Sequence, residues 1–449
     1  MNNQKQNGSI IAIITMMFLY AMISFVTNLA APIGVIWKHA FPGDSANTIG
    51  MLGNAMNFLA YLFMGIPAGK LLTKIGYKKT ALAGIAIGFF GVLIQFFSGK
   101  VGGAPTTGFA IYLLGAFVSG FSVCMLNTVV NPMLNLIGGG GNRGNQLNMI
   151  GGTLNSLSGT LTPMLVGSLI GTVTASTTMS DVNLVLYIAL AVFFCAFIVL
   201  SFIPINDPEM GHTTAETVFE HSPWSFRHFV LGTIAIFVYV GVETGIPGTL
   251  NFYISDTAKG AFVGMNGIAN AAAIGGFLAG TYWLLMLVGR LVSSFIADKV
   301  SSRTLMLIAT SVAMVFLLCA ILLGRSSFVS MPVFTGSGFQ MVSVPIAAMF
   351  IVLCGLCTSV MWSCIFNLAT AGLGKYTAAG SGIFMMMVVG GGVMPYIQDM
   401  IARSGMGYVN SYWLVIAMLA YILFYSLIGS KNVNKDIPVS EEPFDARNL

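Results

Sequence analysis

Twelve long apolar runs constrain this sequence more than any other feature. A helix that crosses the hydrocarbon core of a bilayer needs about 20 apolar residues. The runs are continuous rather than alternating, which indicates helices and argues against a transmembrane barrel. They cover residues 10–37, 48–72, 79–98, 107–136, 146–172, 183–204, 227–254, 266–296, 304–324, 341–370, 378–401 and 410–429. The sequence therefore predicts an all-α polytopic membrane protein with twelve transmembrane helices.

The composition agrees with a chain that lies in a bilayer. Charged residues make up 7% of its 449 residues, whereas a soluble globular protein carries about 25%. With 56% apolar residues, the chain is too hydrophobic to stay disordered in water. Membrane lipid is therefore an expected partner. The net charge of +5 is small, so nucleic acid is not expected as a partner.

The cysteines and the first apolar run give no sign of a cofactor or a cleaved leader. All six cysteines lie in apolar runs, and the CxxC pair of Cys354 and Cys357 has no second pair and no histidine nearby. Small apolar helix residues explain this pattern, so we expect no metal and no cofactor. The run 10–37 is too long for the apolar region of a signal peptide.

A polar stretch and an internal echo divide the chain into halves. Residues 205–226 separate six apolar runs from six. The basic segment GIPAGKLLTKIGYKK (65–79) has a counterpart half a chain later in GRLVSSFIADKVSSR (289–303). We expect two pseudo-symmetric six-helix bundles, residues 1–204 and 227–449, joined by a cytoplasmic linker, with a site at the midplane between them. Because one chain supplies both bundles, we expect a monomer.

The basic residues predict the orientation. An even number of helices places both termini on one side, which would hold thirteen Lys and Arg residues against five on the other. Positive charge is retained in cytoplasmic loops. We therefore expect both termini in the cytoplasm and the protein in the plasma membrane, which is the inner membrane of a bacterium.

Several segments carry a resemblance to a known family. They are FLYAMISFVTNLAAP (18–32), GIPAGKLLTKIGYKK (65–79), NTVVNPMLNLIG (127–138), LNSL (154–157), YVGVETGIPG (239–248), VGRLVSS (288–294), SVMWSCIFNLATAGLGKYTAAGSG (359–382) and VVGGGVMPYIQDMIA (388–402). On these segments the chain resembles the fucose–proton symporter family of the major facilitator superfamily, which also contains glucose/galactose and N-acetylglucosamine transporters. The resemblance implies the major facilitator fold, alternating access of two bundles, a sugar substrate and a proton as co-substrate.

Two positions depart from the family pattern. The family's fucose transporter has an acid in its first helix where this chain has Asn28, and a second acid in its fourth helix where this chain has Asn127. The family acids are linked to proton coupling and substrate binding, but amides cannot titrate. The coupling ion is therefore open between a proton and sodium, and uncoupled transport is a further alternative.

Amide side chains inside the runs mark the expected sugar site. Asn127, Asn131 and Asn135 are spaced by four residues, which places them on one face of a helix. Polar side chains in a span cost free energy unless they face a cavity or a partner, and an amide both donates and accepts, as a sugar hydroxyl does. The alternative is that the amides hold helices together. Asn135 is expected to be structural, and the substrate-binding candidates are Asn28, Asn127, Asn131, Asn155 and Asn367.

Aromatic side chains supply the other part of an expected sugar site. The C–H face of a pyranose is apolar and packs on a ring, while its hydroxyls take hydrogen bonds. The candidates are Tyr282, Trp283 and Trp362, the last of which stands where the family has an aromatic residue. Most other aromatic residues are expected to face lipid or the core.

Glu243 and Arg290 are the clear charges deep in the runs. Burial favours the neutral form of an isolated carboxyl group, whereas an adjacent arginine keeps it ionised. In one hypothesis Glu243, which is also a substrate-binding candidate, carries the coupling proton in place of the family acids. In the other, it is a structural partner for Arg290 or for the backbone freed at Pro247; the family's own acid at this position favours this second hypothesis. Asp399 is a further titratable candidate.

The end of the second run and the segment that joins it to the third form the expected gating loop. Glycines allow helices to approach closely, and the superfamily resemblance adds a role for this basic segment in gating between the bundles. The residues concerned are Gly65, Gly69, Lys70, Lys74 and Lys78.

Together these features predict a secondary active transporter that imports a neutral monosaccharide of the fucose, glucose/galactose or N-acetyl amino sugar type. The chain has no ATP-binding motif, so accumulation must draw on an ion gradient. Alternatives are an acidic-sugar symporter in which Arg290 meets the carboxylate, an uncoupled sugar facilitator and a sensor without flux. A membrane-embedded enzyme is not expected, because the four histidines are unclustered.

Overall fold

The computed structural model describes residues 2–41, 46–102, 104–170, 176–206, 218–256, 259–265, 271–334 and 338–439. Within these residues, ten helices are long and apolar enough to cross a membrane. One of the ten holds two predicted spans, and α4 is a further long helix that matches a predicted span. The prediction of twelve transmembrane helices is therefore confirmed.

The amino-terminal bundle contains five long helices, one of which is bent. They are α1 (Asn2–Ala40), α2 (Ala46–Ser98), α3 (Pro105–Ile137), α4 (Gly141–Ile170) and α5 (Asn183–Phe202), with the short helix η1 (Met179–Val182) before α5. The second and third predicted spans form the 53-residue α2, which turns at Gly76, where φ is 80°. Only glycine adopts this conformation readily. Lys78 follows the turn, and its Nζ donates to the carbonyl oxygens of Ser201 (2.9 Å) and Ile203 (2.7 Å) at the end of α5.

The helices of the carboxyl-terminal bundle are interrupted more often than those of the amino-terminal bundle. Its elements are η2 (Pro223–Ser225), α6 (Arg227–Ser255), α7 (Ala271–Ser294), α8 (Ser302–Leu323), α9 (Ile346–Thr358), α10 (Met361–Thr370), η3 (Gly374–Tyr376), α11 (Thr377–Met386), η4 (Met387–Val389), α12 (Gly390–Ile401), η5 (Ala402–Met406), α13 (Tyr412–Phe424) and η6 (Tyr425–Gly429). The pair α9 and α10 forms one span, and α11 with α12 forms another. The predicted linker 205–226 lies partly outside the described residues, so the limits of the two bundles stay predictions.

A β-hairpin between α8 and α9 was not predicted. Strands β1 (Phe328–Phe334) and β2 (Phe339–Pro345) pair antiparallel, from Phe328 opposite Pro345 to Phe334 opposite Phe339. The predicted span 341–370 is therefore wrong at its start, because helix α9 begins only at Ile346. An apolar run carries no period that separates a strand from a helix, and Pro345 marks the change.

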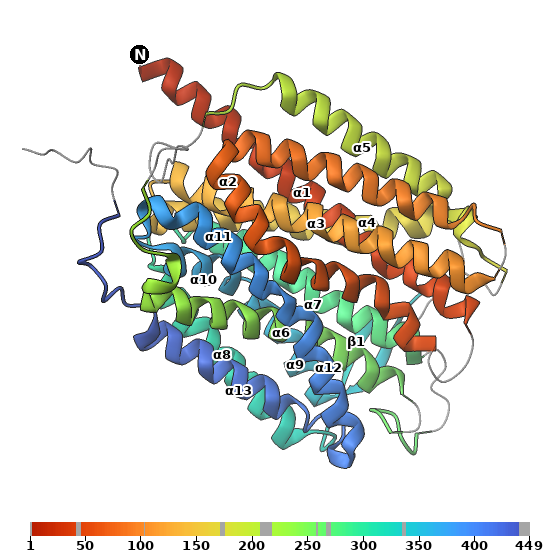
Figure 1. Ribbon diagram of the computed structural model, residues 1–449. Helices are drawn as coiled ribbons and strands as arrows, with labels where there is room; N and C mark the ends of the chain where they lie inside the picture. Colours follow the sequence, from red (N-terminus) through yellow and green to blue (C-terminus); the bar gives the residue numbers. More distant parts are fainter. Residues whose placement is uncertain are drawn as a thin grey trace, which may run out of the picture.

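The two bundles lie side by side, with the red to yellow helices on one side and the green to blue helices on the other (Figure 1). They meet most closely where α2 contacts α11. A Cβ atom added at Gly65 would lie 2.6 Å from the carbonyl oxygen of Gly382 and 2.6 Å from the amide nitrogen of Met386. A Cβ at Gly69 would lie 3.0 Å from the Cα of Gly382. The absence of side chains at these glycines thus allows backbone-to-backbone contact between the bundles.

Substituting valine at Gly65 should separate the bundles at this contact. Overpacking costs about 1–3 kcal/mol, which would lower the population of the closed contact by about fivefold or more. Alkylation of Cys364, which is buried and accepts a hydrogen bond from Asn145 of the other bundle, should become faster, as peptide mass mapping would show.

The controls are a thiol and a glycine elsewhere. Cys354 is buried within the carboxyl-terminal bundle, where its thiol lies against the carbonyl oxygens of Ala313 and Phe350, so its labelling should not change. Gly280→Val adds the same side chain where nothing lies within 4 Å and should leave Cys364 protected. Equal labelling of Cys364 in both valine variants would contradict the proposed role of Gly65.

Candidate substrate site between the two bundles

Asn131 of α3 lies at the centre of a buried polar network. Its Oδ1 accepts a hydrogen bond of 2.5 Å from the Tyr20 hydroxyl and one of 3.0 Å from Trp362 Nε1. Its Nδ2 donates to the carbonyl oxygen of Asn127 at 2.9 Å. Tyr20 belongs to α1 and Trp362 to α10, so this single amide oxygen joins a hydrogen bond within one bundle to a hydrogen bond between the bundles.

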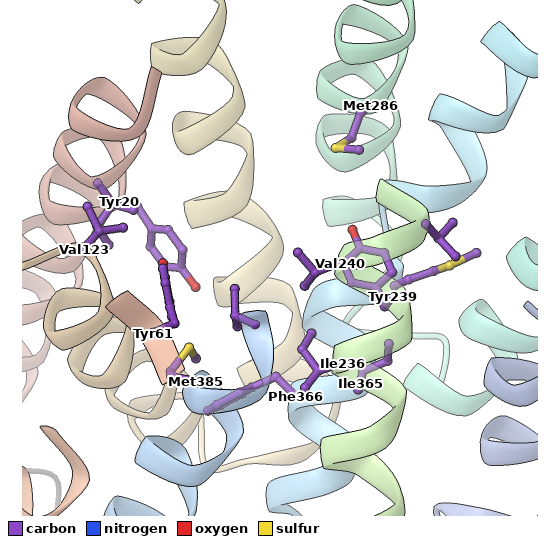
Figure 2. Close-up of a cluster of buried hydrophobic side chains, with 14 of the residues drawn as sticks. Tyr20, Tyr61, Val123, Ile236, Tyr239, Val240, Met286, Ile365, Phe366 and Met385 are labelled. Atoms are coloured by element: carbon purple, nitrogen blue, oxygen red, sulfur yellow. The ribbon is translucent and has the colours of Figure 1, made fainter. Parts of the chain in front are cut away.

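Tyrosines and amides of the amino-terminal bundle surround this centre. Asn127 Nδ2 donates to the Tyr61 hydroxyl at 2.7 Å, and the Tyr20 hydroxyl also lies 3.1 Å from Asn148 Oδ1. Figure 2 shows Tyr20 and Tyr61 on one side and Tyr239 of α6 on the other. Asn127 and Asn131 are therefore engaged by protein groups in this conformation, as the helix-contact alternative expects.

Two other predicted amides keep capacity for a ligand. Asn28 is half-buried, and its Nδ2 donates only within α1, to the Ser24 carbonyl oxygen (2.8 Å) and hydroxyl (3.1 Å). A Cβ at Gly159 would lie 3.1 Å from Asn28 Nδ2, which places this amide against α4. Asn155 of α4 is also half-buried and donates to the Tyr20 carbonyl oxygen at 3.0 Å.

Arg290 of α7 forms an ion pair with Glu243 of α6. The Nη2–Oε1 distance is 2.9 Å, and the two side chains are 10% and 13% exposed. The same guanidinium donates through Nη1 to the Gly152 carbonyl oxygen (3.2 Å) and to Ser156 Oγ (2.7 Å) of α4. Its Nε donates to the carbonyl oxygen of Ser359, between α9 and α10, at 3.3 Å. A buried charge needs such a full set of partners, and this set spans both bundles.

The three predicted aromatic residues differ in their burial and in their contacts. Trp362 is partly buried and lies edge-on to Tyr239 and Phe384, with ring centroids 6.4 Å apart in each case. Tyr282 is fully buried, and its hydroxyl lies 2.9 Å from Thr358 Oγ1 of α9. Trp283 is 38% exposed and stands edge-on to Tyr282. Among the three, Trp362 alone is joined to the amide network by a hydrogen bond.

Several candidates lie apart from this network. Asn367 is buried and donates to Ser302 Oγ (2.7 Å) at the start of α8. Asp399 pairs with Arg403 at 2.7 Å, and Arg403 is 69% exposed. Lys70 and Lys74 are exposed. Gly152 and Ser156 were not predicted as partners of Arg290, although their spacing of four residues places them on one face of α4.

A second set of hydrogen bonds joins the bundles near the connection between α3 and α4. Asn135 Nδ2 donates to Thr370 Oγ1 (3.2 Å), and Gln146 Nε2 donates to the Ser294 carbonyl oxygen (2.9 Å). The Ser381 hydroxyl donates to the Thr128 carbonyl oxygen at 3.2 Å. With the contact of Gly65 and Gly382, these bonds hold the bundles together at one end of the helices.

Comparisons with known proteins agree with this architecture. The model of the Major Facilitator Superfamily matches residues 13–395. A glucose/galactose transporter of Brucella abortus is 28% identical over 435 residues, which are 96% of each chain. The L-fucose–proton symporter of Escherichia coli is 21% identical and covers 91% of this chain and 90% of its own. A crystal structure of the E. coli fucose:proton symporter superposes with a TM-score of 0.76 at 16% identity, covering 95% of this chain and 100% of the other.

The chain belongs to the Major Facilitator Superfamily. The resemblance predicted from the sequence is confirmed, as are the two-bundle fold and the membrane-integral character. Because the family and the relatives are transporters, the prediction that the chain is not an enzyme is also confirmed.

Replacing Asn131 with leucine should destabilise the protein. The similar-sized side chain would leave the Trp362 indole without its acceptor and the Tyr20 hydroxyl with only the longer bond to Asn148, and an unsatisfied buried group costs about 1–3 kcal/mol. The melting temperature in detergent should therefore fall clearly below that of the wild type. Asn28→Leu is the matched control, because its bonds lie within one helix, and it should cost less than about 1 kcal/mol. Equal melting temperatures for both variants would show that the network contributes no stability.

Proposed function

We propose that this protein is a secondary transporter that imports a neutral monosaccharide by alternating access, with the sugar bound between the bundles. The names of the relatives, glucose/galactose transporter and L-fucose–proton symporter, support the substrate class. The single structural observation that carries the proposal is the hydrogen bond between Trp362 and Asn131, which crosses from one bundle to the other. The indole and the amide at this position are the kinds of group that bind a sugar.

Binding of a sugar would replace this bond. The Asn131 oxygen accepts from Tyr20 and Trp362 and so uses both of its lone pairs. A sugar hydroxyl can donate to the amide oxygen and accept from the indole, so it can stand between the two groups. Asn28 and Asn155, which keep capacity for further hydrogen bonds, would hold other hydroxyls. The two bundles would then be joined through the substrate.

The charge pair favours a neutral sugar over an acidic one. Arg290 already has a carboxylate partner in Glu243 and three further acceptors in Gly152, Ser156 and Ser359. A sugar carboxylate would have to displace Glu243, which would leave that carboxylate without its counter-charge. The acidic-sugar alternative therefore requires Glu243 to be protonated before the sugar binds, whereas a neutral sugar can bind beside the intact ion pair.

The same pair is the proposed coupling element. Asn28 and Asn127 cannot take up protons, and Asp399 pairs with an exposed arginine. Protonation of Glu243 would leave Arg290 without its anion, so that the guanidinium could leave Gly152 and Ser156 of the other bundle for another partner. Proton uptake would thus be linked to movement between the bundles. We further propose that the protein is a monomer in the bacterial inner membrane, with both termini in the cytoplasm.

Uptake into proteoliposomes tests the function. Labelled glucose, galactose, fucose, N-acetylglucosamine and sialic acid should be compared with and without imposed proton and sodium gradients. A neutral sugar should accumulate, and sialic acid should not compete with it. Asn28→Ala should raise the KM by about tenfold, because one hydrogen bond to the sugar is lost. Absence of flux for every neutral sugar under all gradients would overturn the proposal.

The variant Glu243→Gln tests the coupling. It keeps the size of the side chain and an acceptor for Arg290, but it cannot exchange a proton. Accumulation driven by a proton gradient should be lost, while exchange of labelled for unlabelled sugar at equal concentrations should persist. Asp399→Asn is the control and should accumulate sugar as the wild type does. If Glu243→Gln still accumulates sugar in response to a proton gradient, Glu243 is a structural partner of Arg290 only.

A further inference from the structure

A cavity at the far end of the carboxyl-terminal bundle has no part in the site described above. Its volume is about 420 Å³. It lies between the end of α6 and the segment that follows it, the end of α8, and the segment that precedes α13. Its lining includes Tyr253, Lys259, Arg325, Met406, Tyr408 and Val409.

Two cations line this cavity. Lys259 and Arg325 are both exposed. Arg325 is held in place by a hydrogen bond of 2.7 Å from its Nη2 to the Val263 carbonyl oxygen. Among the described residues, Asp256 lies beside them and already accepts from the Tyr408 hydroxyl at 2.8 Å and from the Lys259 backbone amide at 3.0 Å, while Asp399, which also lies near Tyr408, is paired with Arg403. The cavity therefore presents net positive charge.

A buried hydroxyl in the wall of the cavity lacks a partner. Tyr253 is 3% exposed, and its hydroxyl has no hydrogen-bond partner among the described residues. A buried polar group without a partner costs free energy, so such groups call for a ligand or a water molecule. Burial and the neighbouring Asp256 raise the pKa of Tyr408 to about 12, so its phenol remains neutral at physiological pH.

The other walls are apolar apart from Asn410. Val263, Ile321, Met406 and Val409 line them. The glycines at 324 and 407 have φ of 48° and 81° and carry no side chain that would fill the space. The cavity also lies where α6 and α8, two of the candidate spans, end, and we expect the ends of spans to lie near the polar headgroups of a bilayer. A ligand that fits these walls is negatively charged at one end.

We propose that this cavity binds a phosphate group, with Lys259 and Arg325 pairing with its charge and Tyr253 donating a hydrogen bond to one of its oxygens. An arginine fork and a lysine ammonium are the side chains that bind phosphate best. The phosphate can belong to an anionic phospholipid, whose glycerol and first methylene groups would meet the apolar walls, or to a soluble phosphate. This site is independent of the proposed sugar transport.

Binding measurements on the full-length protein in detergent test the proposal. Native mass spectrometry would measure how much phosphatidylglycerol the protein retains, with phosphatidylcholine, which has no net charge, as the comparison. In a second measurement, the melting temperature in inorganic phosphate would be compared with that in chloride at equal ionic strength. Lys259→Gln combined with Arg325→Gln should lower the retention or the stabilisation by about tenfold. Tyr253→Phe keeps the ring and both charges and should give a smaller loss of about fivefold.

Lys100→Gln is the matched control, because Lys100 lies on the other bundle, where its ammonium stands 5.3 Å from the Phe96 ring centroid. This variant should bind as the wild type does. If the double variant loses only the retention of phosphatidylglycerol, the cavity is a lipid site. If it loses the stabilisation by inorganic phosphate, the ligand is a soluble phosphate. If the double variant does not fold, the same binding measurements are made on Lys259→Gln and Tyr253→Phe as single variants. Anion binding that is equal in wild type and all variants would overturn the proposal.

Discussion

A guanidinium held among membrane helices cannot be left without partners, and much of the contact between the bundles follows from this constraint. Taking a charge out of water costs several kcal/mol unless it is paired and hydrogen-bonded. Arg290 meets the requirement with Glu243, with Gly152 and Ser156 of α4, and with the carbonyl oxygen of Ser359. The relative positions of α4, α6 and α7 at this level are thereby tied to one side chain.

The remaining contacts between the bundles are of a kind that can be broken and remade. Asn135, Gln146 and Ser381 each contribute a single hydrogen bond across the contact, and such a bond is worth about 1 kcal/mol net. Gly65 and Gly382 contribute backbone contact without interlocking side chains. Transport by rocking bundles needs two arrangements of similar free energy, and weak, separate contacts are compatible with that need.

The sequence predicted the features that depend on length and periodicity. The apolar runs defined the spans, the spacing of Asn127 and Asn131 placed both amides on one face of α3, and the glycines before the basic segment marked a close approach of helices. Partners across the bundles could not be predicted, because they depend on how each helix is rotated about its axis. For this reason the bond from Trp362 to Asn131 was missed, and nothing in the sequence showed that Tyr282 turns toward α9.

The β1–β2 hairpin has a mechanical consequence. Strand β2 ends at Pro345 and α9 begins at Ile346, so no loop separates them. At the hairpin's other end, Phe339 packs edge-on against Phe277 of α7, with ring centroids 5.8 Å apart. The hairpin is therefore held at both ends by helices of one bundle, at its base by α9 and near its turn by α7. A tilt of α7 relative to α9 would strain the strand pairing, so the hairpin couples the movements of these two helices near the ends at which they begin.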